Sequence, residues 1–441
     1  MGNLRPDWIR KVEKKIESTP KFCIARNALT RSAVGQSALN WNSFRKISHT
    51  FSHIVPDELK ITTQKQSGRC WIFAALNMLR LKVAHKYKLD EFELSQNYLF
   101  FWDKLEKANY FLQSMIDTAK EPVDSRLVMY LLSKPLEDGG QWHMFVSLVD
   151  KYGVVPKSIY PDSFAATQSS EINQILSLKL REYASLLREH APRGIDHLMS
   201  MKEEMMEEVF RILAIHLGTP PQTFDWEFKD KGKKFHAFRG LTPKEFFKEH
   251  VKVHLDDFVC LVHSPRKITP YYQTFTIQYL GNVVEGKKII YVNVPVDVMS
   301  KAAVESLKHH EPVWFGCDVG KFLHRELGVM DLSLFDYELL YDIKFRMNKE
   351  ARMNHGASQM THAMLFTGVN LIDDKPDRWR VENSWGDDKG EKGYFIMTHD
   401  WFDEFMFEIA VEKRFLPKEV LKVVDLPPSP LPPWDPLGAL A

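Results

Sequence analysis

The hydrophobic pattern of the chain changes near residue 290, and this change limits which folds the sequence can adopt. Residues 71–89 carry apolar side chains at helical spacing, which predicts one long, well-packed helix. After residue 290 the apolar segments are short and rich in β-branched and aromatic residues, as expected of strands. These segments are Ile289–Val296, Val313–Val319, Met364–Ile372, Trp379–Trp385 and Gly393–Thr398. They predict an antiparallel half-barrel or sheet.

A mainly helical region is predicted between about residues 165 and 290. Apolar residues recur at helical spacing over 172–187 and over 201–213, and proline or glycine residues stop both patterns. The methionines of the second pattern more often fill gaps in a core than form a binding face. Four lysines between residues 229 and 234 indicate a solvated loop, with nucleic-acid contact as the alternative.

The first 60 residues are too few for a domain of their own and carry a helical pattern around Asp7–Ile16. We expect them to wrap the part of the chain that follows. The first residues lead into a charged segment rather than an apolar one, so no secretion signal is visible. No apolar run approaches the ~18 residues that cross a membrane.

Cys70 is the first candidate for chemistry. It stands where a loop passes into the predicted helix, and the unpaired N–H groups of a helix N-terminus favour a thiolate. Gln64, six residues earlier, offers an amide that can donate to the oxygen of a carbonyl under attack, with the Cys70 N–H as second donor. The alternative is that Cys70 is simply a small buried hydrophobic residue.

A base and a residue to orient it are found about 300 residues further on. His362 stands just ahead of an apolar strand, and Asn383 stands at the end of the next one. Neighbouring strands bring such residues together, and a thiol nucleophile requires both functions. Alone, His362 would be an ordinary buried histidine. The order Gln, Cys, His, Asn and the string Asn383–Gly386 are much more specific than any of these residues alone.

Two further segments are notable. Gly139 and Gly140 allow another backbone to approach closely, although a plain turn is the commoner reason for paired glycines. Residues 427–436 contain six prolines, so the tail 426–441 is extended and at ~3.1 Å per residue reaches roughly 50 Å. Without other information, a disordered extension would be favoured.

Charge and cysteine content exclude some classes of protein. The net charge of +1 produces no strong field toward nucleic acid or an acidic membrane surface. The four cysteines are widely spaced and form no C-x-x-C pair, which fits a reducing compartment, so we expect a cytoplasmic protein. The sequence has no serine nucleophile elbow, zinc-binding helix motif or phosphate loop, and no metal or cofactor is expected.

Together these motifs resemble the papain-like cysteine proteases. Nearly the whole chain is more narrowly similar to the bleomycin hydrolases, a family of intracellular aminopeptidases in that clan. The similar stretches are Ser67–Phe73, Tyr98–Lys104, Asp138–Trp142, Trp314–Gly320 and Trp434–Pro436. The resemblance implies an α+β, papain-like fold, with a helical half, an antiparallel β half-barrel, a large, mainly helical insertion and an extended C-terminal arm toward the active site.

The resemblance also assigns roles to the catalytic candidates. Cys70 is implied to be the nucleophile and His362 the general base and then the general acid. Asn383 is implied to orient the imidazole, and Gln64 to donate to the oxyanion. The implied reaction is hydrolysis of N-terminal residues from peptides and aminoacyl amides, bleomycin-type amides included, through an acyl-thioester.

Further implications concern binding and assembly. Gly139 and Gly140 are implied to hydrogen-bond the substrate backbone. Ala441, at the end of the tail, is implied to lie in the cleft, where its carboxylate would pair with a substrate amine and limit cleavage to one residue. The family forms hexameric barrels, so a homohexamer is expected. The alternative from another class is a ring-shaped scaffold protein that binds peptides or nucleic acid.

The spacing of the site residues predicts how the chain is divided. His362 follows Cys70 by 292 positions, whereas ~130–150 are typical of a compact papain-like enzyme. The surplus matches the predicted insertion. We therefore expect an N-terminal arm and helical half at 1–165, the insertion at 166–290, the β half at 291–425 and the C-terminal arm at 426–441.

Overall fold

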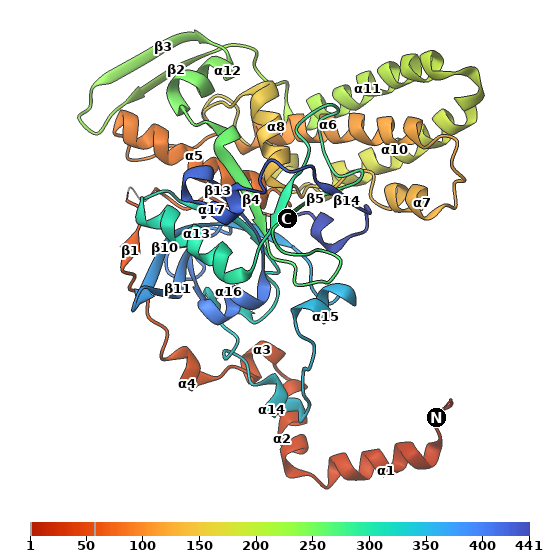
Figure 1. Ribbon diagram of the computed structural model, residues 1–441, viewed down its shortest axis with the longest axis vertical. Coiled ribbons are helices and arrows are strands. Elements are labelled where there is room, and N and C mark those ends of the chain that lie inside the picture. The colour runs from red at the N-terminus through yellow and green to blue at the C-terminus, as the bar shows by residue number, and fades with distance from the viewer. Residues whose placement is uncertain (1, 57–58) are drawn as a thin grey trace.

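The predicted long helix is α5, in which every residue from Cys70 to Arg80 is buried. The computed structural model describes residues 2–56 and 59–441, and Figure 1 shows α5, α6 and α8 above most of the large sheet. Helix α6 begins after Ser95, whose hydroxyl accepts the N–H of Tyr98 as an N-cap. The helices of this part are α5 (Cys70–Tyr87), α6 (Gln96–Asp117), α7 (Arg126–Ser133), α8 (Trp142–Tyr152) and α9 (Phe164–Thr167).

The two helical patterns between residues 165 and 290 form the long antiparallel pair at the upper right of Figure 1. They are α10 (Ser170–His190) and α11 (Ile195–Leu217), and both pack against α6. Met205 of α11 is buried in the core, whereas Lys231–Lys234 are exposed at the turn of a hairpin. The hairpin and the turns after it are β2 (Phe224–Lys229), β3 (Phe235–Leu241), α12 (Pro243–Phe246), the π-helical turn Phe247–Val251 and the 3-10 turn Leu255–Asp257.

The strands predicted after residue 290 belong to one large sheet. Its order is β14-β5-β6-β4-β13-β7-β10-β11-β12-β9-β8, with β1 also paired to β10. The run from β4 to β12 is antiparallel, and parallel pairs flank it. The strands are β1 (His53–Ile54), β4 (Phe258–Val262), β5 (Gln273–Ile277), β6 (Tyr291–Asn293), β7 (Val313–Cys317), β8 (Leu323–His324), β9 (Val329–Met330), β10 (His362–Ile372), β11 (Lys375–Glu382), β12 (Tyr394–Thr398), β13 (Met406–Glu412) and β14 (Ser429–Leu431).

Strands β7 and β10 separate two hydrophobic cores. Successive side chains of a strand point to opposite faces. Trp314 and Leu365 therefore join the core of the helical half, whereas Phe315 and Met364 join a second core on the other face. The second core is covered by helices that follow the strands. The helices after β6 are α13 (Val296–Lys308), α14 (Tyr337–Tyr341), α15 (Lys349–Asn354), α16 (His399–Phe405) and α17 (Lys418–Leu421), and of these α13, α16 and α17 contribute buried side chains to the second core. The central strands are thus fixed from both sides.

The N-terminal residues do not wrap the body as expected. Helices α1 (Pro6–Glu17) and α2 (Pro20–Leu29) have no buried residue, and Figure 1 shows them projecting away from the rest of the molecule. The chain returns to the body through α3 (Val34–Ser37), α4 (Trp41–Phe44) and β1. The apolar side chains of α1 find no cover within the described part of this chain, which is the physical reason for the difference.

The proline-rich tail is extended and ordered along the body. Strand β14 pairs with β5 in parallel, a 3-10 turn covers Pro436–Gly438, and the last residue is buried. Strands β4 and β5 lie within 166–290 and yet belong to the large sheet, so the division of the chain at 290 stays a prediction. In residues 2–56 and 59–441, no helix has the length and apolarity that crossing a membrane requires.

Candidate active site

Cys70 is the first residue of α5, so it lies where a loop passes into a helix, as the sequence predicts. The loop before it is fixed at Gly68, whose N–H donates to the Asp138 carboxylate at 2.9 Å. Trp71, directly after the cysteine, donates its indole N–H to the Asp138 carbonyl at 2.8 Å. Cys70 is only 2% exposed. These contacts hold the cysteine at a buried position against the segment that contains the paired glycines.

His362 and Asn383 lie on neighbouring strands. His362 begins β10, Asn383 directly follows β11, and the imidazole Nε2 lies 2.9 Å from Asn383 Oδ1. This oxygen also accepts the N–H of Ser384 at 2.8 Å, which identifies it as the acceptor end of the amide. Nε2 therefore carries the ring proton, and Nδ1 is the basic nitrogen. The ring of Trp385 covers the pair, with its centroid 4.8 Å from that of His362.

The packing of helix on sheet brings the cysteine and the histidine to the same place. Helix α5 packs against β10, and the backbone N–H of Ala363, the residue after His362, lies near enough to the Cys70 thiol to lower its pKa. Cys317 of β7 lies opposite His362 in the sheet, and burial, Asp318 and the nearby Cys70 raise the pKa of its thiol. Two parts of the chain that are 292 positions apart therefore meet at the thiol.

Burial governs the protonation of both groups. It raises the pKa of the Cys70 thiol to about 11, although three backbone N–H groups around the sulfur act against it. Burial also lowers the pKa of His362 to about 4, whereas the Asn383 hydrogen bond raises it and the Arg325 charge lowers it. The thiolate expected from the helix N-terminus is thus opposed by burial. Transfer of a proton from thiol to imidazole creates both charges together and leaves the net charge of the site unchanged.

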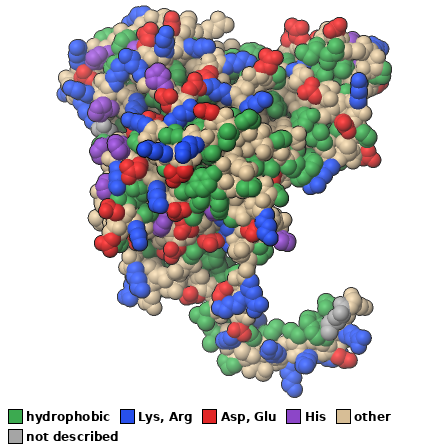
Figure 2. Space-filling model, in the orientation of Figure 1, with side chains coloured by type: hydrophobic (Ala, Val, Ile, Leu, Met, Phe, Trp, Pro, Cys, Tyr) green, Lys and Arg blue, Asp and Glu red, His purple; other side chains and the backbone are tan. Residues whose placement is uncertain are grey.

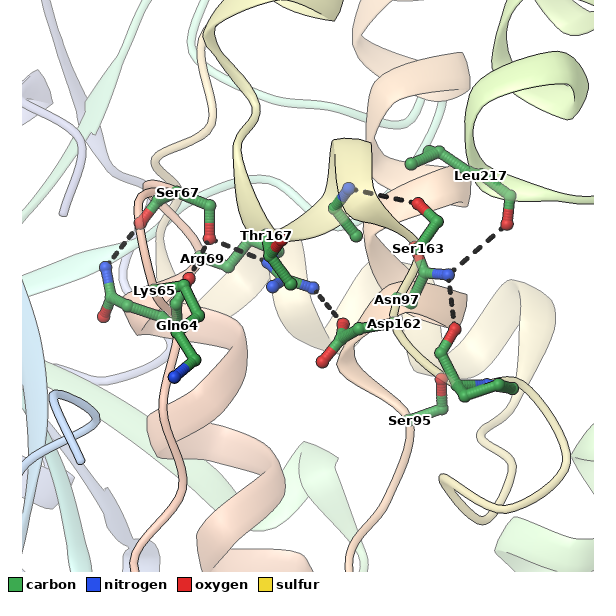
Figure 3. Close-up of polar contacts among 12 residues, drawn as sticks. Gln64, Lys65, Ser67, Arg69, Ser95, Asn97, Asp162, Ser163, Thr167 and Leu217 are labelled. Carbon is green, nitrogen blue, oxygen red and sulfur yellow. Dashed lines mark hydrogen bonds and ion pairs between the residues drawn. The ribbon is translucent and has the colours of Figure 1, made fainter. Parts of the chain in front are cut away.

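The Gln64 amide is fixed at both ends. Its Oε1 accepts the hydroxyl hydrogen of Ser384 at 2.6 Å, and its Nε2 donates to the Ser67 carbonyl at 2.5 Å. Figure 3 shows the second of these bonds, in the loop that leads to the cysteine. Because Nε2 carries two hydrogens, one N–H is left for an incoming oxygen. Ser384 bonds to both Gln64 and Asn383, and in this way it joins the two predicted polar residues.

The paired glycines lie against the end of the tail. The N–H of Gly140 donates to the Ala441 carbonyl and the N–H of Ala441 donates to the Gly140 carbonyl, both at 3.3 Å. A Cβ on Gly139 would stand 2.6 Å from the Ala441 oxygen, and one on Gly140 would stand 2.4 Å from the Trp71 ring. Close approach on both sides therefore requires glycine at both positions. The structure brings Ala441 to the glycine pair, as the sequence interpretation expects.

Two buried lysines of α6 support the glycine segment, and sequence reasoning missed both. Lys107 donates to the Gly139 carbonyl at 2.6 Å and pairs with Asp103 at 2.6 Å. The Lys104 ammonium lies 2.5 Å from the Asp138 carboxylate. Burial raises the pKa of Asp138, but the positive charge of Lys104 and the hydrogen bonds to the carboxylate hold that pKa well below its usual range. The available signal was that both lysines share the buried face of an aromatic-rich helix.

The fold and the site define the class of protein. A cysteine at a helix N-terminus, a histidine at the start of a facing strand and an asparagine bonded to that histidine are the arrangement of a papain-like cysteine peptidase. The model of the Peptidase C1-like family matches residues 3–438, and the chain belongs to this family.

Known proteins of similar sequence and structure cover the full length of the chain. It is 47% identical to a bleomycin hydrolase from Gallus gallus, covering 97% of this chain and 96% of that protein. It is 43% identical to an aminopeptidase C from Listeria innocua, with 99% and 98% covered. The crystal structure of PepW from Lactobacillus rhamnosis HN001 matches with a TM-score of 0.97 at 41% identity and covers 100% of both chains. These matches confirm the resemblance and do not favour the scaffold alternative.

The hydrogen bond from His362 to Asn383 generates a prediction. Because the bond raises the pKa of the imidazole, Asn383→Ala should leave His362 a weaker proton acceptor and reduce the thiolate fraction at neutral pH. Loss of one pKa unit corresponds to about a tenfold slower alkylation of Cys70 by iodoacetamide at pH 7. Asn370→Ala is the control, because Asn370 lies on β10 as His362 does but bonds to Asp377. It should leave the alkylation rate unchanged. An unchanged alkylation rate in Asn383→Ala would contradict this role.

Proposed function

We propose that the chain is a cysteine aminopeptidase that removes N-terminal residues from peptides and related aminoacyl amides. The observation that carries the proposal is the packing of α5, which begins at Cys70, against β10, which begins at His362, with the imidazole held by Asn383 at 2.9 Å. Relatives named bleomycin hydrolase and aminopeptidase C support this reaction class. Bleomycin-type amides are proposed as substrates on the same basis.

The geometry supports the following reaction. His362 Nδ1 takes the thiol proton, and the Cys70 sulfur attacks the substrate carbonyl carbon. The resulting oxyanion accepts the backbone N–H of Cys70 and the free N–H of Gln64. His362 then gives its proton to the leaving amine, and the acyl-thioester is left on the sulfur. Water activated by His362 hydrolyses the thioester and releases the acid, which returns the thiol. No further proton donor is required.

The tail supports the restriction to N-terminal residues. An extended peptide would bind Gly140 through one N–H and one carbonyl, and Ala441 occupies both of these groups. Gln141 adds a hydrogen bond to the Ala439 carbonyl at 2.6 Å. A substrate peptide can therefore bind only beyond Ala441. This restricts to N-terminal residues a cleft that would otherwise suit internal cleavage.

The tail is anchored firmly enough for this role. Arg266 forms two hydrogen bonds with the Asp435 carboxylate, at 2.7 and 3.0 Å, and both side chains are about 3% exposed. Paired arginine and carboxylate groups of this geometry are strong and directional. The Arg126 guanidinium lies 3.9 Å above the Trp434 ring, and Tyr130 meets that ring edge-on. These contacts support a docked tail.

Replacement of Cys70 tests the proposed chemistry. Cys70→Ala removes the nucleophile and should reduce hydrolysis of aminoacyl amides to background, while the circular dichroism spectrum and thermal unfolding stay those of the wild type. Cys317→Ala is the matched control, since it removes a buried neighbouring thiol of the facing strand and should retain activity. Hydrolysis by purified Cys70→Ala at the wild-type rate would refute the proposal.

Shortening the tail tests the restriction to N-terminal residues. Deletion of residues 439–441 removes the groups bound to Gly140 and Gln141 but keeps the Arg266–Asp435 pair. We expect weaker aminopeptidase activity and new cleavage inside N-acetylated peptides. Mass spectrometry of the products measures both. Ser429→Ala, at an exposed position of the tail, should leave the products unchanged. Identical product patterns for the deletion and the wild type would dismiss the blocking role.

We also propose a cytoplasmic homohexamer. The apolar residues of the projecting arm support association with other copies, because Figure 2 shows hydrophobic side chains along it. Ile24 of α2 is 70% exposed and Leu339 of α14, which packs on α2, is 73% exposed. Contiguous apolar patches of this kind mark interaction sites. The free state of the four cysteines supports a reducing compartment.

Sedimentation velocity tests the assembly. The wild type should sediment with the mass of six chains, and the double variant Trp8→Asp, Ile24→Asp should dissociate because it places charges in the proposed interface. The double variant Lys11→Gln, Lys14→Gln, on exposed positions of the same arm, changes the net charge by the same amount and is the control. A wild-type protein with the mass of one chain at micromolar concentration would contradict the proposal.

A further inference from the structure

The residue directly before the nucleophile carries a fully buried positive charge. Arg69 is 0% exposed, and its Nη1 lies 2.6 Å from Asp162 Oδ1. Its guanidinium lies over two aromatic rings, 5.2 Å from the centroid of Phe73 and 5.4 Å from that of Phe100. Figure 3 shows the guanidinium between the loop that contains Ser67 and the segment that contains Asp162.

Stability alone gives no reason for this charge. Apolar residues of similar volume often replace a buried ion pair without loss of stability. Nη2 of Arg69 has no hydrogen-bond partner, so the site is not fully compensated. Asp162 neutralises the charge at close range, so the guanidinium is a weak source of long-range field at the thiol. The remaining explanation is the direction of the hydrogen bonds that Arg69 donates.

Arg69 determines the direction of one hydroxyl group. Its Nε donates to Ser67 Oγ at 2.9 Å, and an arginine nitrogen can only donate. The hydroxyl must therefore accept from Arg69, and its single hydrogen is directed to the backbone carbonyl of Gln64, 2.7 Å away. In return the side-chain amide of Gln64 donates to the backbone carbonyl of Ser67 at 2.5 Å. The two residues are locked together by this reciprocal pair of bonds.

The lock fixes the amide that donates to the oxyanion. One N–H of Gln64 is held by Ser67, and Oε1 is held by the Ser384 hydroxyl at 2.6 Å. The second N–H then has one direction available. The backbone of the loop is held separately, because the Gln66 N–H donates to the Thr167 carbonyl at 2.9 Å. Arg69 therefore acts on the Gln64 backbone carbonyl through the Ser67 hydroxyl, and it reaches the side-chain amide only through the Ser67 backbone carbonyl to which that amide donates.

We propose that Arg69, held by Asp162, is a positioning residue. Through the Ser67 hydroxyl it holds the backbone from Gln64 to Ser67 in the conformation in which the Ser67 carbonyl orients the Gln64 amide toward the substrate oxygen. The proposal rests on the proposed cysteine peptidase function. It adds Arg69 and Ser67 to the groups on which stabilisation of the oxyanion depends. Neither residue touches the reacting atoms.

The first test removes the connection between Arg69 and Gln64. Ser67→Ala and Arg69→Lys should each lower kcat by about tenfold or more with KM nearly unchanged, a part of the ~10²–10³ lost when an oxyanion donor is removed. Lysine retains the charge but cannot bridge Asp162 and Ser67 as the planar guanidinium does. Ser67→Thr retains the hydroxyl and should restore most of the activity.

The second test asks whether the effect passes through Gln64. In a Gln64→Ala background, Ser67→Ala should lower kcat by no more than about twofold further. The effects of two substitutions are not additive when both residues act through the same hydrogen-bond network. Equal losses in both backgrounds, or no loss in either, would overturn the proposal. Lys157→Met is the matched control, since Lys157 also pairs with Asp162, at 3.4 Å, but makes no bond to the loop. It should keep kcat.

The third measurement separates this proposal from the proposed function. Iodoacetamide alkylates Cys70 without forming an oxyanion, so Ser67→Ala and Arg69→Lys should be alkylated at the wild-type rate. Slower alkylation would show an effect on the thiol and overturn the proposal. Hydrolysis that persists in Cys70→Ala would instead refute the proposed function, and this is measured first. The thermal unfolding midpoint of each variant is also measured. A loss of kcat that is explained by unfolding of the variant would also count against the positioning role.

Discussion

The active site depends on one contact, the packing of the N-terminus of α5 against the start of β10. The helix supplies Cys70 and the strand supplies His362, and the Ala363 N–H lies near enough to the thiol to lower its pKa. Trp314 of β7 strengthens the contact by donating its indole N–H to the Trp71 carbonyl at 3.1 Å. Because the two cores lie on opposite faces of β7 and β10, the strand cannot shift without disturbing both.

Buried polar contacts extend from this contact to both sides. On one side Asn383, Ser384 and Gln64 form a continuous chain of hydrogen bonds to the oxyanion loop. On the other side Lys107 and Asp138 hold the glycine segment on which the tail lies. Burial makes such groups costly unless they are bonded, so the polar network specifies a single arrangement. The same burial raises the pKa of the Cys70 thiol, so a nearby base is needed to take its proton.

Much of the fold and part of the site could be predicted from sequence, for physical reasons. The helix that begins at Cys70 and the strands near His362 and Asn383 follow from local periodicity, which the packing reinforces. The pairs Arg69–Asp162 and Lys104–Asp138 could not be predicted, since common residue types 93 and 34 positions apart carry no local signal. The arm was misjudged because periodicity shows that a helix has an apolar face but not what covers that face.

The central claim is that Cys70 forms an acyl-thioester with a single N-terminal residue. A direct test is acid quenching during turnover of a slowly hydrolysed tripeptide amide with a free N-terminus, followed by mass spectrometry of the peptide that contains Cys70. We expect a mass increase on Cys70 equal to one aminoacyl group, absent in His362→Ala. An adduct on another residue, or accumulation of dipeptidyl groups on Cys70, would contradict it.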